Sequence, residues 1–276
     1  MNKRIDSLPP IPVVAQKILM LKINTDEGEQ ALFKLIEKDP SIMSKIIGLS
    51  NSPIYGSGRK ILTLHEASTL LGTKRVKMIA LSLSMMSSVT KSSKGLLDID
   101  GLWKHSLSIA LTMDTLAGYM PKDRRPPEDE IYLAGLLHDI GYLVLNYIDP
   151  QLCDQFCNRL AAEPNRSVDE IEAEMLEKSH NELGAELGQH WGLPESIVAV
   201  LRGHHNPPVN PEAPHHSMIA VSSMAAKLFP AFRNHETEQM NISVDDWVSL
   251  GIDPKFEDEI KLKVIMHTEQ VNGISI

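Results

Sequence analysis

Helix start and stop signals recur along almost the whole of this 276-residue sequence and divide its apolar stretches into short lengths. Ser or Thr followed three residues later by Glu or Asp is typical of a capped helix N-terminus. Asp followed by Pro supplies an N-cap and a proline at the first helical position. No convincing stretch alternates with the period of two that a half-buried strand requires. The sequence therefore predicts an all-α fold. The signals are Thr63 with Glu66, Ser179 with Glu182, Ser243 with Asp246, Asp39-Pro40 and Asp253-Pro254.

Between these signals, apolar residues recur at intervals of three and four, as on one face of a helix. A Ser/Lys-rich break at residues 91–95 separates two groups of such segments. We therefore expect a two-lobe helical bundle, with an N-terminal lobe over 1–95, a second lobe over 96–230 and a helical extension over 231–276. Helices are expected over 11–23, 29–38, 41–49, 63–71, 73–90, 101–119, 129–146, 150–162, 168–178, 179–191, 195–204 and 215–229, with Thr73 as an N-cap, and in two short segments near the C-terminus.

The composition is that of a folded, acidic protein. Hydrophobic residues make up 42% of the chain and charged residues 23%, as in globular domains. The net charge of −9 would repel a phosphate backbone, which argues against nucleic acid as a partner. Basic residues cluster at 74–77 and 122–125, and we interpret both clusters as solvated faces or helix ends.

Other features favour a protein of the cytoplasm. The two cysteines, Cys153 and Cys157, are four residues apart on one predicted helix, and buried free thiols are a simpler interpretation than a two-cysteine metal site. The first 16 residues lack the apolar core of a signal peptide. The most apolar uncharged run, residues 78–90, is too short to span a bilayer, so no membrane association is expected.

Eleven histidines are present, and their placement is more informative than their number. His138 and Asp139 lie in a strongly apolar segment between Gly135 and Gly141, which would allow another helix to approach closely. A carboxylate in such surroundings is costly unless it is paired, hydrogen-bonded or bound to metal.

Three further histidines, His105, His180 and His204, lie on the apolar stripes of other predicted helices. Together with His138 they place imidazoles on four helices that should face one core. A single such histidine is most often structural, but four beside an aspartate favour a metal site inside the bundle. This donor set suits one or two ions of iron, manganese, nickel or zinc, and a carboxylate can bridge two of them. A hydrogen-bonded polar core without metal is the alternative.

Taken in order, several motifs resemble those of HDOD domains, relatives of the HD and HD-GYP metal-dependent phosphohydrolases. Each motif is weak alone, but their order and spacing between residues 6 and 229 are specific. The resemblance implies a two-lobe all-α fold and a regulatory role in bacterial signal transduction. The motifs are Leu8-Pro-Pro-Ile-Pro12, residues 35–40, 49–52, 67–72, 103–106, 134–141, 180–187 and 191–194, and His204-His205.

The resemblance also implies a ligand set, with two departures from the HD pattern. The Asp that closes this pattern falls at Ser223, or at Ser222 with a shift of one, and the Lys that follows HDIG in HD-GYP enzymes is Tyr142. The GYP signature is absent as well, which argues against hydrolysis of cyclic di-GMP in the HD-GYP manner. The positions that match ligands are His105, His138, Asp139, His180, His204 and His205.

Two hypotheses about function follow. The first is a non-catalytic module that acts on another signalling protein through helix-face contacts, with any metal in a structural or sensory role. The second is a metal-dependent phosphohydrolase acting on a nucleotide or other phosphate ester, with Asp139 in its active site. The departures favour the first. The amphipathic C-terminal segments, residues 241–247 and 256–270, would pack on the body or form a homodimer.

Overall fold

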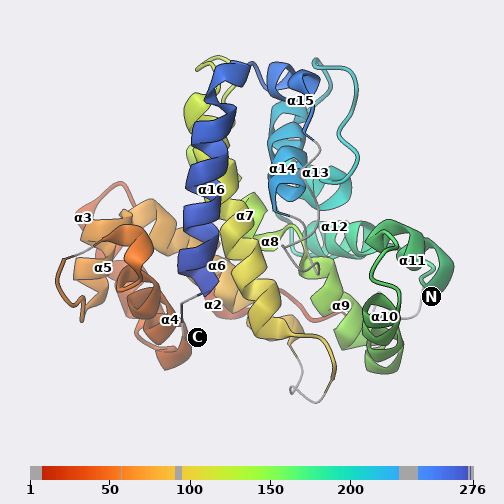
Figure 1. The fold of residues 1–276 in the computed structure, drawn as a ribbon. Helices are drawn as coiled ribbons and strands as arrows, with labels where there is room; N and C mark the ends of the chain where they lie inside the picture. The colour runs from red at the N-terminus through yellow and green to blue at the C-terminus, as the bar shows by residue number, and fades with distance from the viewer. Residues whose placement is uncertain (1–7, 57, 91–94, 230–241, 273, 275–276) are drawn as a thin grey trace. The chain divides into compact units, whose positions relative to one another are not determined.

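The computed structural model describes residues 8–56, 58–90, 95–229, 242–272 and 274, and no strand occurs within these ranges (Figure 1). The all-α prediction is confirmed. The chain divides into two compact units: a large one of residues 1–10 and 89–264, and a small one of residues 11–88 and 265–276. The division of the sequence into three parts, over residues 1–95, 96–230 and 231–276, stays a prediction. The Ser/Lys-rich break lies, apart from Gly95, outside the described residues.

The small unit is built from short helices whose starts follow the sequence signals. The Asp39 carboxylate accepts hydrogen bonds from the amides of Ser41 and Ile42, and Thr63 forms the expected capping box. Thr73 was wrongly expected to be an N-cap. It is the first helical residue, and its hydroxyl donates instead to Glu29 Oε1 at 2.6 Å. The elements are α2 (Val13–Met20), α3 (Asp26–Ile36), α4 (Pro40–Ser50), the 3-10 turn η1 (Pro53–Tyr55), α5 (Leu64–Leu71) and α6 (Thr73–Val89).

The large unit contains the longer helices and all the candidate site residues. Capping boxes begin α12 and α15 at Ser179 and Ser243, as expected, and a further one begins α11 at Ser167. Its elements are α7 (Ile99–Tyr119), α8 (Glu128–Leu137), α9 (Ile140–Ile148), α10 (Pro150–Ala162), α11 (Val168–Met175), α12 (His180–His190), α13 (Glu195–Gly203), α14 (His216–Leu228), α15 (Val244–Ser249), the 3-10 turn η2 (Pro254–Phe256) and α16 (Glu257–Asn272), of which the last residues belong to the small unit.

The single helix expected over residues 129–146 is in fact two helices. His138 still has helical dihedral angles, and regular geometry is lost at Asp139, which has φ −100° and ψ 14° and makes no side-chain cap. This sparsely populated conformation is common at functional sites. Glu128–Ile148 is the one stretch of the described residues long and apolar enough to cross a membrane. Since 89% of its apolar window is buried inside the protein, it is typical of a core segment.

Two glycines allow the close helix packing that the sequence indicated. A Cβ on Gly135 of α8 would lie 2.5 Å from the Cα of Ala110 on α7. A Cβ on Gly141 of α9 would lie 1.9 Å from the carbonyl oxygen of His180, at the start of α12. Any larger residue at either position would push the helices apart.

Both basic clusters contribute to helix ends, as the sequence interpretation allowed. Lys77 donates to the carbonyls of Leu19 and Leu21 at the end of α2, and Arg125 donates to those of Gly118 and Met120 at the end of α7. These cations satisfy carbonyls that have no partner within their own helix.

The cysteines are free thiols, as expected, with Cys153 buried and Cys157 half-buried on α10.

Replacement of Gly141 by Ala should lower the free energy of unfolding by about 1–3 kcal/mol, because the new methyl group displaces α12 from α9. Gly118→Ala is the matched control, because Gly118 is exposed on α7 and a Cβ there meets no atom within 4 Å. Alanine's helix propensity should make that variant neutral or up to about 1 kcal/mol more stable. Equal stability of the two variants in urea titrations would contradict the close packing of α9 and α12.

Candidate metal centre

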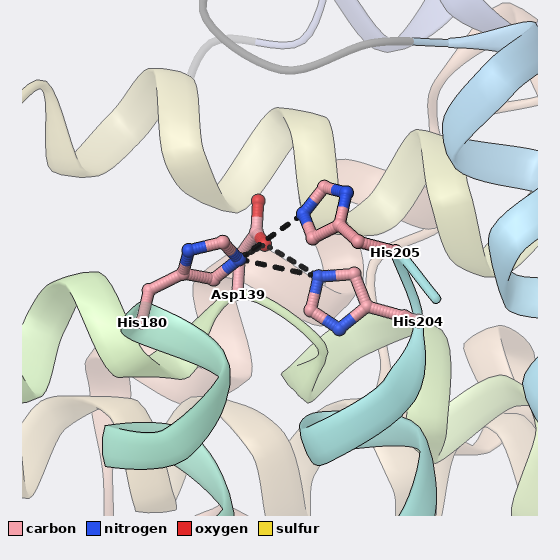
Figure 2. A group of neighbouring side chains, drawn as sticks. All are labelled: Asp139, His180, His204 and His205. Carbon is pink, nitrogen blue, oxygen red and sulfur yellow. Dashed lines mark hydrogen bonds and ion pairs between the residues drawn. The ribbon is translucent and has the colours of Figure 1, made fainter. Parts of the chain in front are cut away.

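All six candidate residues lie in the large unit, and the structure brings them together. They come from α7, the junction of α8 and α9, the first residue of α12 and the end of α13. In Figure 2 the rings of His180, His204 and His205 are grouped around the carboxylate of Asp139. Their donor atoms form two groups with Asp139 in common, and within each group these atoms lie within 4.8 Å of one another. The histidines that helix periodicity placed on inward faces, His105, His138, His180 and His204, thus lie together, and His205, which only the resemblance indicated, lies beside them.

One oxygen of Asp139 faces the α12 and α13 histidines. Oδ1 lies 3.5 Å from Nε2 of His180 and 3.4 Å from Nε2 of His204. His180 Nε2 is itself 3.3 Å from His204 Nε2 and 3.2 Å from His205 Nε2 (Figure 2). Four donor atoms from two helices and a helix junction thus converge on one small volume.

The other oxygen of Asp139 faces a second pair of histidines. Oδ2 lies 3.2 Å from Nε2 of His138 and 3.5 Å from Nε2 of His105. It is buried and has no hydrogen-bond partner among the described residues. A buried carboxylate oxygen in this state is costly unless a cation or a proton occupies the space before it.

Backbone contacts determine which nitrogen of two imidazoles carries the proton. Nδ1 of His138 lies 2.9 Å from the Gly135 carbonyl, and Nδ1 of His204 lies 3.1 Å from the Val200 carbonyl. Because a carbonyl only accepts, each Nδ1 must donate, and in the neutral ring Nε2 then has only its lone pair. Both lone pairs point towards Asp139.

Burial governs the protonation of two members of this group. The side chains of His138, Asp139, His180 and His204 are at most 3% exposed. Burial lowers the pKa of His204 to about 3, so this ring is neutral near pH 7. Burial alone would raise the pKa of Asp139, but contacts with the neighbouring imidazoles, His138 foremost, hold it well below its usual range, which requires a proton or another positive charge on the nitrogens that face it.

The spacing of the donors matches a metal site. Donors about 2.1 Å from one ion are about 3.0 Å apart in an octahedron and about 3.4 Å apart in a tetrahedron. The contacts of 3.2–3.5 Å between Asp139, His180, His204 and His205 lie close to this range. The residues present therefore fit a divalent ion.

Glu172 of α11 is a buried site residue that the sequence did not identify. Its Oε1 lies 2.6 Å from Nδ1 of His180, so this third ring too is held by its Nδ1. No sequence signal distinguishes Glu172 from the exposed Glu170 and Glu174 on the same short helix.

Aromatic rings cover two of the imidazoles. Tyr142, at the position of the HD-GYP lysine, is buried, and its ring stacks on His180 with centroids 4.3 Å apart. Phe229 stacks on His105 at 5.3 Å. Each ring covers one face of an imidazole, and of the six candidates only His105 and His205 are half-buried rather than buried.

The two serine candidates for the missing HD aspartate lie on α14 and are buried. The Ser222 hydroxyl donates to the Ile219 carbonyl of its own helix at 2.9 Å, so it already has a partner. No carboxylate is supplied from this part of α14.

The buried neutral state of His204 should make the metal-free protein sensitive to acid. Below about pH 6.5 the unfolded chain binds a proton at this histidine, whereas the folded protein refuses it down to about pH 3. Stability is therefore lost as the pH falls through this window. Between pH 7 and pH 5 the wild type should lose about 2 kcal/mol more than His204→Gln, as measured by urea unfolding with a chelator present. Equal losses would show that His204 titrates normally.

Comparison with known proteins agrees with this architecture. An uncharacterised protein of Treponema pallidum is 27% identical over 232 residues, which are 81% of this chain and 43% of that protein. Ribonuclease Y of Thermotoga petrophila is 29% identical over 136 residues, 49% of this chain and 20% of the enzyme. This chain thus spans less than half the length of either relative.

Three solved structures are similar over most of the chain. A candidate signal transduction protein of Marinobacter aquaeolei has a TM-score of 0.76 at 25% identity, over 96% of this chain and 58% of that one. An HDOD domain protein of unknown function from Geobacter sulfurreducens has a TM-score of 0.77 at 21% identity, over 98% of this chain and 94% of that one. A candidate phosphohydrolase of Shewanella amazonensis has a TM-score of 0.73 at 18% identity, over 99% of this chain and 97% of that one. The model of the HDOD domain matches residues 8–207, well over half of the sequence, and this chain therefore belongs to the HDOD domain family.

Proposed function

We propose that this chain is a regulatory module of bacterial signal transduction in which Asp139 and five histidines hold one or two divalent metal ions. One observation carries the metal part of the proposal: imidazole nitrogens and a carboxylate point at one another inside a buried space. His180 and His204 present Nε2 atoms 3.3 Å apart, and both lie beside the carboxylate. The residues proposed to hold the metal are His105, His138, Asp139, His180, His204 and His205.

Without a cation or a bound proton this arrangement is electrostatically unfavourable. When none of the facing nitrogens carries a proton, their lone pairs repel one another and the carboxylate, and burial strengthens the repulsion because little water screens it. A divalent ion would supply the opposing positive charge and connect helices that are distant in the sequence. Imidazole and carboxylate donors suit iron, manganese, nickel or zinc equally, and the proposal does not choose between them.

The limited exposure of the centre supports a regulatory rather than a hydrolytic role: four of the six proposed ligands are buried, and His105 and His205 are half-buried. Tyr142 and Phe229 cover the rings of His180 and His105, and the side chain of His105 is only 11% exposed. A phosphate ester would need room beside the donors. The module would act instead through contacts with another signalling protein, and the Marinobacter protein, at 25% identity, is described as a candidate for signal transduction. Homodimerisation through the C-terminal helices remains part of the proposal, to be measured by sedimentation.

A metal-dependent phosphohydrolase acting on a nucleotide or other phosphate ester is the second candidate. Asp139 presents each of its oxygens to a different pair of histidines, an arrangement in which one carboxylate could bridge two ions. A Shewanella protein of this fold is described as a candidate metal-dependent phosphohydrolase, at 20% identity and a TM-score of 0.65.

Metal analysis tests the proposal first. Protein purified without chelator should contain about one or two ions per chain, and their removal should lower the melting temperature by several degrees, since an ion that binds only the folded state stabilises it. Added manganese, iron or zinc should restore the loss. Asp139→Asn keeps the side chain's size but removes its charge, and it should respond to neither treatment. Absence of metal from the wild type under every condition would leave a hydrogen-bonded polar core instead.

Turnover separates the two candidate functions. We expect the metal-loaded protein to release no phosphate from nucleotides or model phosphate esters above the rate of the Asp139→Ala variant. Hydrolysis that is clear in the wild type and lost in this variant would establish the phosphohydrolase and overturn the regulatory proposal.

A further inference from the structure

Glu172 is a buried carboxylate that the six proposed ligands do not explain. Its side chain is 2% exposed on α11, a short surface helix. Burial of an ionised carboxylate is costly unless hydrogen bonds compensate it. Both oxygens of Glu172 form such hydrogen bonds, and both bonds are to His180. Oε1 contacts Nδ1 of His180 at 2.6 Å, and Oε2 accepts from the His180 backbone amide at 3.3 Å.

Tyr142 completes the arrangement around His180. Its hydroxyl forms a hydrogen bond with the Glu172 carboxylate, and its ring lies 4.3 Å from the His180 ring at an interplanar angle of 17°. The stacking determines the plane of the imidazole, and the Glu172 contact determines its rotation within that plane. As a result, Nε2 of His180 faces Asp139.

The acceptor of the Nδ1 proton distinguishes His180 from the two other rings whose Nδ1 is held. His138 and His204 donate to neutral backbone carbonyls, whereas His180 donates to a carboxylate. A charged acceptor makes a stronger hydrogen bond and makes the opposite nitrogen a better electron donor to a metal. Two other Nε2 atoms, those of His204 and His205, also lie within 3.3 Å of the Nε2 of His180.

We propose that Glu172 is a positioning residue for metal binding, which holds His180 in the tautomer and orientation that direct Nε2 at the ion, with Tyr142 as its support. The inference rests on the proposed function, since it assumes that the centre takes a metal. It adds a residue outside the ligand set and assigns a role to α11. Glu172 itself touches no ion in this arrangement.

A matched control lies two residues further along the same helix. Glu174 forms ion pairs with Arg159 of α10 and with Arg166, which lies between α10 and α11, and its side chain is 46% exposed. Glu174→Gln therefore makes the same chemical change as Glu172→Gln on the same helix, away from His180. Exposed ion pairs contribute little to stability, so the control should fold normally.

The experiment is a titration of the metal-free full chain with Zn²⁺ in competition with a chromophoric chelator, and with Co²⁺ followed by its visible absorption. Glu172→Gln should bind Zn²⁺ about 10- to 100-fold more weakly than wild type, as is common when a histidine ligand loses its carboxylate partner. Its Co²⁺ spectrum should also change, because His180 is no longer held in place. Glu174→Gln should match the wild type in affinity and spectrum.

The outcomes distinguish the inference from the proposal on which it rests. Wild-type protein that binds neither Zn²⁺ nor Co²⁺ would overturn both. Wild-type protein that binds these ions, together with a Glu172→Gln variant of equal affinity and unchanged spectrum, would overturn the inference alone, even if the variant melts at a lower temperature. If Glu172→Gln does not fold, Tyr142→Phe decides. It keeps the ring stacking, removes one hydrogen bond and should weaken Zn²⁺ binding about two- to tenfold, and an unchanged affinity would overturn the inference.

Discussion

The buried charge of Asp139 is the constraint on which the large unit depends. A carboxylate that is 2% exposed in an apolar segment must be offset by its surroundings, and here imidazoles surround it on both oxygens. These imidazoles belong to helices distant in the sequence, so each helix must begin or end at a particular residue. His180 is the first residue of α12, and His204 immediately follows α13. The break between α8 and α9 serves the same end, because it frees Asp139 from a continuous helix.

Close helix packing makes this convergence possible. Gly141 brings the backbone of α9 against the first residue of α12, two residues from Asp139 and directly at His180. Gly135 brings α8 against α7, which carries His105, and its carbonyl accepts the Nδ1 proton of His138. The same glycines therefore determine both helix spacing and ligand placement, so packing and site chemistry cannot vary independently here.

Much of this could be read from the sequence, because the signals were local. Capping boxes and Asp-Pro pairs located helix starts, and helical periodicity placed His105, His180 and His204 on inward faces. What was missed depends on tertiary contacts. The apolar run through residues 129–146 gives no sign of the break at Asp139, which lies where this carboxylate meets histidines of other helices. Glu172 is likewise set apart only by its contact with His180, because the exposed residues Glu170 and Glu174 on the same helix are glutamates too.

The physical consequence of a metal in such a place bears on regulation. A ligand shifts a conformational equilibrium only by as much as its affinity differs between the two states. A cation held by donors from four segments of the large unit would bind the assembled arrangement far better than any in which α12 or α13 has moved. Binding of the ion to this centre, or of a proton in its place, would then favour the packing in which α12 and α13 hold their donors together. A hydrolase needs the opposite property, a centre that stays assembled while substrate enters and leaves. The stacking of Tyr142 and Phe229 on two of the proposed ligands agrees better with the first task than with the second.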